Sequence, residues 1–129
     1  MPRYLTDEWL DAAQRAVEAD DALADATRDV HLTVQQVVTG GPDGDVAYHV
    51  AIADGTVRIV TGDASEANVT FIQNWETATA VGRGELSAQG AFMTGRIRVR
   101  GDLPKLAEHG NVFGGIGDVF AGLRASTTY

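Results

Sequence analysis

Side chains that can act as acids, bases or metal ligands are few and scattered in this sequence. The three histidines, His31, His49 and His109, have no acidic residue or second histidine at the spacing that a metal site uses. His31 and His49 fall on neighbouring predicted strands, but two histidines without a third ligand make a poor metal site. The chain has no cysteine, which excludes disulfides and thiolate nucleophiles. These residues therefore predict neither a metal site nor a bound cofactor.

A serine nucleophile or a buried carboxylate would be the remaining route to catalysis. No Gly-x-Ser-x-Gly motif occurs, and Ser65, Ser87 and Ser126 have no local signature. Glu76 follows Trp75 on a predicted helix, and it is the one carboxylate that burial beside a pocket could turn into an acid or base. Helical spacing favours an exposed position for Glu76. We therefore predict no catalytic residues and no enzyme.

Residues 96–100 alternate arginine with isoleucine and valine. This pattern predicts a strand with one solvent-exposed face and one face covered by other elements. The arginine row also has the charge to meet a phosphate or a coenzyme A headgroup. The glycine clusters at 82–84 and 114–117 lack the strand-then-helix context and the Gly-Lys-Ser/Thr sequence of a nucleotide-binding loop.

The acidic balance and the composition limit the class of protein. Ten basic and eighteen acidic residues give a net charge of −8, which repels nucleic acid at long range. The 129 residues, of which 44% are hydrophobic, predict one domain with a buried core, residues 1–129. No apolar run reaches the roughly 18 residues of a membrane helix, and the first residues contain no secretion signal. We therefore expect a cytoplasmic protein, and the excess of arginine over lysine favours a bacterial one.

The N-terminal segment predicts a helix from residue 6 to about residue 20. Thr6 suits the N-cap position, because its hydroxyl can accept a hydrogen bond from a free amide of the first turn. Trp9, Leu10 and Val17 recur at helical spacing and give one apolar stripe. The alanine-rich stretch that follows, up to Ala26, either ends this helix or continues it weakly.

Residues 30–61 alternate apolar and polar side chains, which is the spacing of strands. Two turn signals interrupt them: a glycine-rich stretch at 40–44, and Asp54-Gly55, which favours a two-residue hairpin. The segment therefore predicts a three-stranded antiparallel meander. Further elements are predicted as a strand at 67–72, helices at 73–81 and 85–91, and a strand around 97–99.

The last apolar stretch, residues 112–123, has helical spacing but a composition that weakens a helix. Gly114, Gly115, Gly117 and Gly122 lie within it, and each costs about 1 kcal/mol relative to alanine in a helix interior. Such a helix depends on what its apolar face contacts. Two interpretations stay open here: a core helix whose glycines allow close packing, or a mobile lid whose low stability lets a guest enter.

The order of the predicted elements is helix, three strands, strand, helices, strand and helix. Alternation within the strands leaves one sheet face apolar, and helices must cover that face. The sequence therefore predicts an α+β fold, with a five-stranded, mostly antiparallel sheet and helices packed on one face.

One stretch of the chain resembles the sterol carrier protein type two family. Residues 84–103 contain, in order, a glycine, a short predicted helix that begins with Glu-Leu, the sequence Ala-Phe-Met-Thr-Gly at 91–95, a strand with alternating arginines, and Gly101-Asp102. The upstream order agrees, with the predicted hairpin followed by Ala-Asn-Val-Thr at 67–70. There Asn68 replaces the aspartate that is common in the family. The resemblance covers residues 28–123.

This resemblance implies an apolar tunnel between the sheet and its helices, which holds a lipid without consuming it. We therefore expect non-catalytic binding and transfer of a fatty acid, an acyl chain or a sterol-like guest. The tunnel is expected to be lined by aliphatic and aromatic side chains of the covered sheet face and of the helices around it. These are Val57, Ile59, Phe71, Trp75, Phe92, Met93, Ile97, Val99, Phe113, Ile116 and Phe120.

Two other functions stay open at this stage. The tunnel could be the active site of a cyclase or isomerase, with Glu76 or a histidine facing it. The domain could also be a dimerisation or accessory module for an enzyme, with an exposed apolar patch on its last helix. The expected partners are an apolar small molecule and, transiently, a membrane or an enzyme, with no nucleic acid. We expect a monomer or a homodimer.

Overall fold

A five-stranded sheet with the strand order β3-β2-β1-β4-β5 organises the computed structural model, which describes residues 1–129. Three antiparallel neighbours form the predicted meander, namely β1 (His31–Gly41), β2 (Gly44–Ala53) and β3 (Thr56–Thr61). β4 (Val69–Asn74) runs parallel to β1, and β5 (Arg98–Gly101) pairs antiparallel with β4 at the sheet edge. The prediction of a mostly antiparallel sheet is confirmed, with one parallel pair at its centre.

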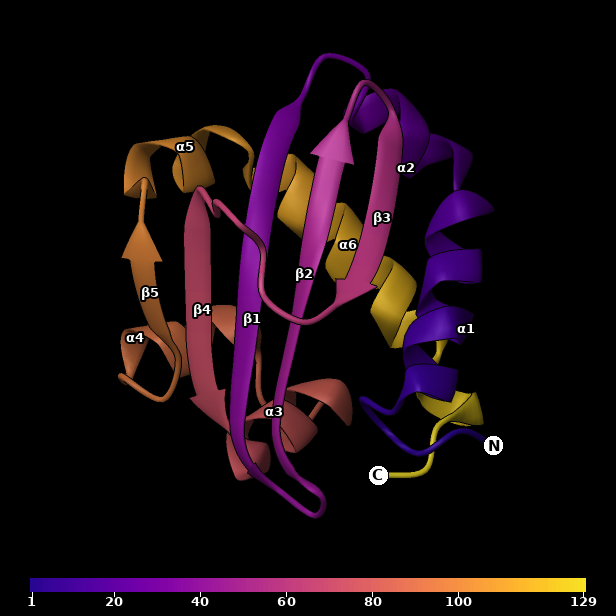
Figure 1. Cartoon of the computed structure of the whole chain (residues 1–129), viewed down its shortest axis with the longest axis vertical. Helices are drawn as coiled ribbons and strands as arrows, with labels where there is room; N and C mark the ends of the chain where they lie inside the picture. Colours follow the sequence, from indigo (N-terminus) through magenta and orange to yellow (C-terminus); the bar gives the residue numbers. More distant parts are fainter.

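Helices cover one face of this sheet and leave the other face open (Figure 1). α1 (Asp7–Glu18) lies beside β3, and α6 (Gly110–Gly122) crosses the sheet on its covered side. The shorter helices are α2 (Asp21–Ala26), α3 (Trp75–Gly82), α4 (Ala88–Met93) and α5 (Leu103–Glu108), followed by a 3-10 turn at Arg124–Ser126. None of these helices has the length and apolar character that a membrane span requires. The α+β fold class is confirmed.

Side-chain caps set where several helices begin. The Thr6 hydroxyl accepts a hydrogen bond from the Trp9 amide, as predicted. The helix expected at 85–91 begins three residues later, because the Ser87 hydroxyl accepts from the amide of Gly90 and makes Ser87 the N-cap. That helix therefore ends at Met93 instead of Ala91.

α5 is a helix that the sequence pattern did not indicate. The Asp102 carboxylate accepts from the Lys105 amide and caps its start. Pro104 lies in the first turn, where backbone amides have no partner within the helix, so its missing amide proton costs no helical hydrogen bond. The Gly101-Asp102 pair therefore ends a strand and begins a helix within two residues.

The core lies between the covered sheet face and the helices. The inward-facing apolar residues of β1 and β2 are buried, and the apolar faces of α1 and α6 pack against this layer. The two helices that close the core do so with large buried side chains such as Trp9, which is 2% exposed. Members of this core include Trp9, Leu10, Leu32, Val34, Val38, Val50, Ile52, Val112 and Ile116.

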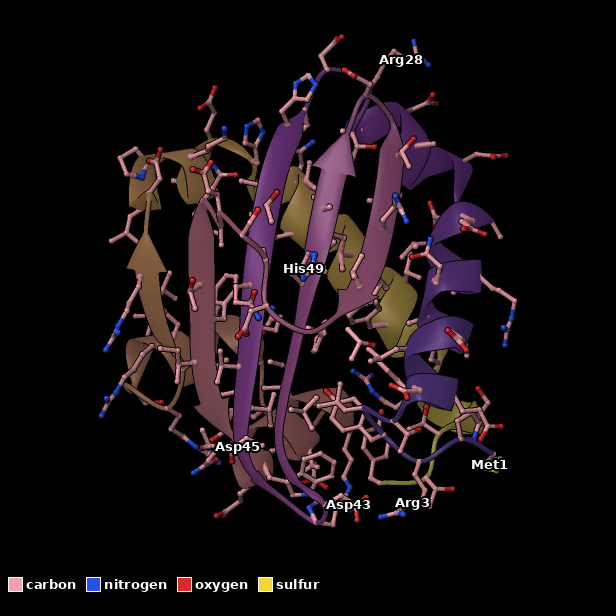
Figure 2. The ribbon with its side chains drawn as sticks, in the orientation of Figure 1. Met1, Arg3, Arg28, Asp43, Asp45 and His49 are labelled. Carbon is pink, nitrogen blue, oxygen red and sulfur yellow. The ribbon has the colours of Figure 1, made fainter.

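The open face of the sheet is crossed by the loop from β3 to β4 (Figure 1). Gln35, which is buried, holds this loop: its Oε1 accepts from the Ala64 amide at 2.7 Å and its Nε2 lies 3.2 Å from the Tyr48 carbonyl oxygen. His49 lies near the centre of the same face, with its Nδ1 3.0 Å from the Gly62 carbonyl oxygen (Figure 2). The loop therefore satisfies the polar groups of the open face.

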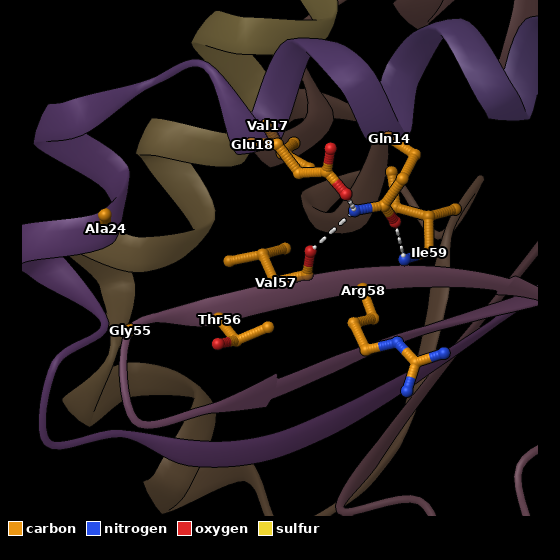
Figure 3. A pocket seen from close by; sticks show the side chains of 9 residues that line it. All are labelled: Gln14, Val17, Glu18, Ala24, Gly55, Thr56, Val57, Arg58 and Ile59. Atoms are coloured by element: carbon orange, nitrogen blue, oxygen red, sulfur yellow. Dashed lines mark hydrogen bonds between the residues drawn. The ribbon is translucent and has the colours of Figure 1, made fainter.

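Gln14 of α1 covers the free edge of β3. Its Nε2 donates to the Val57 carbonyl at 3.0 Å, and its Oε1 accepts from the Ile59 amide at 2.6 Å (Figure 3). One side-chain amide thus makes the two hydrogen bonds that a further strand would make here. Unpaired edge groups of a sheet attract other strands, so this amide both anchors α1 and closes the edge.

We expect Gln14→Ala to lower the free energy of unfolding by about 1–3 kcal/mol, because two half-buried backbone groups lose their partner. Urea denaturation measures this change. Gln89→Ala, which removes an exposed glutamine from α4, is the matched control and should lie within about 0.5 kcal/mol of the parent protein. Equal stability of the two variants would contradict the role given to Gln14.

Candidate functional site

Most glycines of α6 face open space. A Cβ atom added at Gly114, Gly117 or Gly122 would meet no atom within 4 Å. At Gly115 it would lie 3.2 Å from Cδ1 of Leu23. Close packing therefore explains Gly115 alone, whereas Gly114, Gly117 and Gly122 weaken the helix without a packing reason.

An apolar cleft of about 420 Å³ opens between α6 and the segment that joins α3 to α4. Trp9 and Phe120 line it, with their ring centroids 5.4 Å apart in an edge-to-face arrangement. Gly117 belongs to its α6 wall, and Leu86 belongs to the opposite segment. The exposed Arg124 also lines the cleft and donates from Nε to the Gly82 carbonyl. The cleft therefore combines an aromatic interior with a cation on its exposed side.

A second cavity of about 570 Å³ adjoins this cleft near the two chain ends. Leu10, Val46 and Trp75 contribute its apolar lining. Tyr4 and Tyr129 line both the cleft and this second cavity, so they form the wall between the two.

Tyr4 is held in this wall by aromatic neighbours on three sides. Its ring centroid lies 5.0 Å from that of Trp9, 5.8 Å from that of Trp75 and 4.8 Å from that of Tyr129. The backbone amide of Tyr4 donates to the Thr128 carbonyl at 2.8 Å, which joins the first and last residues of the chain. Tyr4 is thus fixed in the wall by its aromatic contacts and by this backbone bond.

The Tyr4 and Tyr48 hydroxyls are buried polar groups without a hydrogen-bond partner in the protein. Every fully enclosed side-chain oxygen or nitrogen has a hydrogen-bond partner, so neither of these two hydroxyl oxygens is completely enclosed. Burial raises the pKa of both groups well above the ordinary value of 10, and proximity of the two hydroxyls adds to the pKa shift of Tyr4. Both therefore stay neutral O–H groups, and Tyr4, which lines the cleft, can bond a polar atom of a guest.

A groove of about 450 Å³ between α1 and β3 is the third cavity of similar size (Figure 3). Val57 and Ile59 line it together with polar and charged residues such as Gln14, Glu18 and Arg58. A fourth hollow of about 460 Å³, with His31 and His109 in its lining, has no hydrophobic residue at all. Neither resembles an apolar ligand site as closely as the cleft beside α6.

The predicted lining residues surround the apolar interior and do not meet in one cavity. Phe71 and Phe113 pack edge to face with centroids 5.9 Å apart, and Ile116 is buried beside them in the core. Phe120 lines the cleft, and Trp75 lines the second cavity. Their part in ligand binding stays a prediction.

The members of that set from α4 and β5 lie further out. Ile97 is buried and Val99 is half-buried, whereas Phe92 and Met93 are 48% and 76% exposed. Phe92 and Met93 therefore point to the surface and not into the interior. The sequence pattern placed them inside because a six-residue helix does not reveal which of its faces is covered.

The groups considered for catalysis lie away from the cleft. Glu76 is exposed in the first turn of α3 and lines none of the four cavities. His49 lies on the open sheet face, and Nε2 of His31 lies 3.1 Å from an Asp54 carboxylate oxygen on the surface. No three histidine or acidic side chains gather as metal ligands do.

The fold and the apolar cleft define a small α+β module with a sheet covered on one face. The chain belongs to the SCP-2 sterol transfer family, whose model matches residues 10–114. No curated protein sequence matches the chain significantly.

Solved structures share this fold. A crystal structure of sterol carrier protein 2 matches with a TM-score of 0.77 at 21% identity, over 92% of this chain and 98% of that one. The solution structure of a possible sterol carrier protein from Thermus thermophilus gives 0.76 at 21% identity, over 95% and 91%. The solution structure of palmitated SCP2L2 from Aedes aegypti gives 0.60 at 18% identity, over 85% and 88%.

The two buried phenols predict a loss of stability at alkaline pH. The unfolded chain releases these protons near pH 10, whereas the folded protein keeps them because the pKa values of Tyr4 and Tyr48 are raised. Their contribution to stability is thus complete below pH 10 and is lost as the pH rises toward the folded pKa. We expect a decline of up to about 1.4 kcal/mol per pH unit for each tyrosine.

The double variant Tyr4→Phe/Tyr48→Phe should flatten this decline. Urea denaturation between pH 7 and pH 11 measures the effect for the variant and the parent protein. Parallel curves for the two proteins above pH 10 would show that the two hydroxyls are not kept neutral by the fold.

Proposed function

We propose that this protein binds an apolar small molecule of the lipid class, without chemical change, and transfers it. The apolar cleft beside a helix that is weak by composition is the observation that carries this proposal. Membership of a sterol transfer family supports it. The guest enters through the cleft, between α6 and the segment that joins α3 to α4.

The space at this site suits one lipid chain once the interior opens. The cleft alone, at about 420 Å³, lies within the range of roughly 300–1,000 Å³ for small-molecule sites. We propose that outward movement of α6 brings Phe71, Phe113 and Ile116 into contact with the guest and extends the cleft into a tunnel. The core residues predicted from the sequence then form its wall.

A fatty acid or acyl chain is the guest that we propose first. Burial of each methylene gains about 0.8 kcal/mol, so about ten methylenes gain about 8 kcal/mol before ordering costs. Binding from this gain is micromolar at its tightest, which allows release as well as capture. A related protein has been studied in a palmitated form. Arg124, on the exposed side of the cleft, can pair with the carboxylate of a fatty acid. The Tyr4 hydroxyl can form a hydrogen bond with a neutral polar group of a guest.

The absence of chemistry in this proposal rests on what surrounds the cleft. Its lining contains no histidine, aspartate or glutamate, and Glu76, the carboxylate considered for an active site, is exposed elsewhere. A general acid or base must reach the reacting atoms within hydrogen-bond distance. The enzyme alternative in the form that uses Glu76 or a histidine therefore finds no support in this cleft.

A pair of glycine substitutions tests the cleft. Gly117 lines it and Gly122 does not, while an added Cβ meets open space at both. Gly117→Leu should fill the cleft and weaken palmitate binding at least tenfold, whereas Gly122→Leu should bind as the parent does. Trp9 fluorescence, measured in a Trp75→Phe background, reports binding because Trp9 lines the cleft.

Thermal denaturation with palmitate provides an independent readout, because a ligand that binds only the folded state raises the melting temperature. The parent and Gly122→Leu should show this rise. If neither palmitate nor a sterol changes the fluorescence or the melting temperature of the parent, the lipid-carrier proposal is wrong. Equal binding by the two leucine variants would place the guest elsewhere.

The proposed role of α6 as a lid predicts a kinetic effect. Gly114→Ala should stabilise α6 by about 0.5–1 kcal/mol, because alanine favours the helix and its Cβ meets no neighbour. If α6 must open for entry, palmitate uptake should slow severalfold while equilibrium affinity changes little. Stopped-flow Trp9 fluorescence measures the rate, and unchanged uptake by a stabilised variant would argue against an opening of α6.

A further inference from the structure

The edge of the sheet at β5 differs in charge from the rest of the protein. Residues 86–101 contain three of the ten basic residues and none of the eighteen acidic ones, in a chain of net charge −8; Glu85 and Asp102 flank this stretch. Arg96, Arg98 and Arg100 are all exposed, and none of them takes part in an ion pair. β5 has only β4 as a neighbour in the sheet, and β4 contains no acidic residue. The guanidinium groups of this edge are therefore free.

Exposed apolar side chains gather at the same edge. Of the four large hydrophobic residues that are exposed, Phe92, Met93 and Leu103 flank β5, at 48%, 76% and 47% exposure, and the fourth is Met1. Phe92 and Met93 precede the strand on α4, and the amides of Arg96 and Ile97 both donate to the Ala91 carbonyl. This fold-back holds the start of the arginine row against α4.

The register of β5 separates the two kinds of side chain. Arg98 lies opposite Ile72 and Arg100 opposite Thr70, on the open face of the sheet, whereas Val99 lies opposite Phe71 on the covered face. The exposed aromatic and thioether groups come from α4, which lies at the foot of β5 (Figure 1). Long arginine side chains can keep their charge in a headgroup layer while their stems contact apolar material. Exposed cations and exposed apolar side chains thus lie along the same edge of the sheet.

From this juxtaposition we propose that the α4–β5 edge, defined by Phe92, Met93, Arg96, Arg98, Arg100 and Leu103, docks the protein on anionic phospholipid membranes. Cationic clusters beside apolar side chains are the features that peripheral membrane proteins use. At physiological salt the screening length is about 8 Å, so acidic groups on distant faces oppose this contact only weakly. Repulsion from those faces directs the protein to this edge, and the contact stays reversible. This inference does not depend on the identity of the guest.

Vesicle flotation tests the proposal with the intact protein. Vesicles of phosphatidylcholine mixed with phosphatidylglycerol should bind it, and vesicles of phosphatidylcholine alone should not. The double variant Arg98→Gln/Arg100→Gln should bind the mixed vesicles about 25-fold more weakly, since each cation near an anionic surface contributes about fivefold, or about 1 kcal/mol. Phe92→Ser/Met93→Ser should also lose binding, and raised salt should release the parent protein.

A matched pair of charges provides the control. Arg15→Gln/Arg58→Gln removes the same net charge from α1 and β3, where both side chains are exposed and take part in no ion pair, and should leave vesicle binding within about twofold of the parent. Equal losses in the two arginine variants would mean that only net charge matters, and the docking edge would be rejected.

Binding of the parent to neither vesicle would also overturn the proposal. If light scattering then showed a dimer that Phe92→Ser/Met93→Ser dissociates, the edge would belong to a contact between two copies. Palmitate binding by Arg98→Gln/Arg100→Gln, followed through Trp9 without vesicles, should match the parent. A failure of membrane docking is thereby distinguished from a failure of lipid binding.

Discussion

α6 keeps its helical form through the contacts of its apolar face, because its own composition opposes it. Val112 and Ile116 are buried against the core, and Phe120 packs edge to face on Trp9. The indole Nε1 of Trp9 also donates to the Thr127 hydroxyl at 2.9 Å, which ties α1 to the segment that follows α6. The rest of the site depends on this arrangement. A helix held by its neighbours can separate from them without unfolding the sheet.

The parts of the fold that the sequence predicted correctly are those in which local pattern and tertiary environment agree. Alternation along residues 30–61 and the Asp54-Gly55 turn predicted the meander, and the Thr6 cap predicted the start of α1. Alternation does not distinguish a parallel from an antiparallel neighbour, so the pairing of β4 with β1 was not predictable in that way. α5 was missed because six residues are too few to show a helical period.

The candidate site was harder to predict, because side-chain direction depends on elements that the sequence does not place in space. Phe120 and Trp75 were expected at the site and line its two cavities. Tyr4 was not expected, since it precedes the first helix and reaches the site only because the two chain ends pair. Leu5, buried in the left-handed region with φ of 61°, turns the chain between Tyr4 and α1. The hydrophobic periodicity of a sequence does not indicate a left-handed turn at a non-glycine residue.

The closing of the β3 edge by Gln14 has a consequence for how the protein behaves in concentrated solution. An open strand edge is a template on which identical chains can stack into cross-β fibrils. Here one edge is occupied by an amide from the protein's own helix, and the opposite edge carries arginines that repel their copies. Fibril growth by edge addition is thus opposed at both sides of the sheet, sterically at one and by like charge at the other. Loosening of α1 would expose the β3 side first.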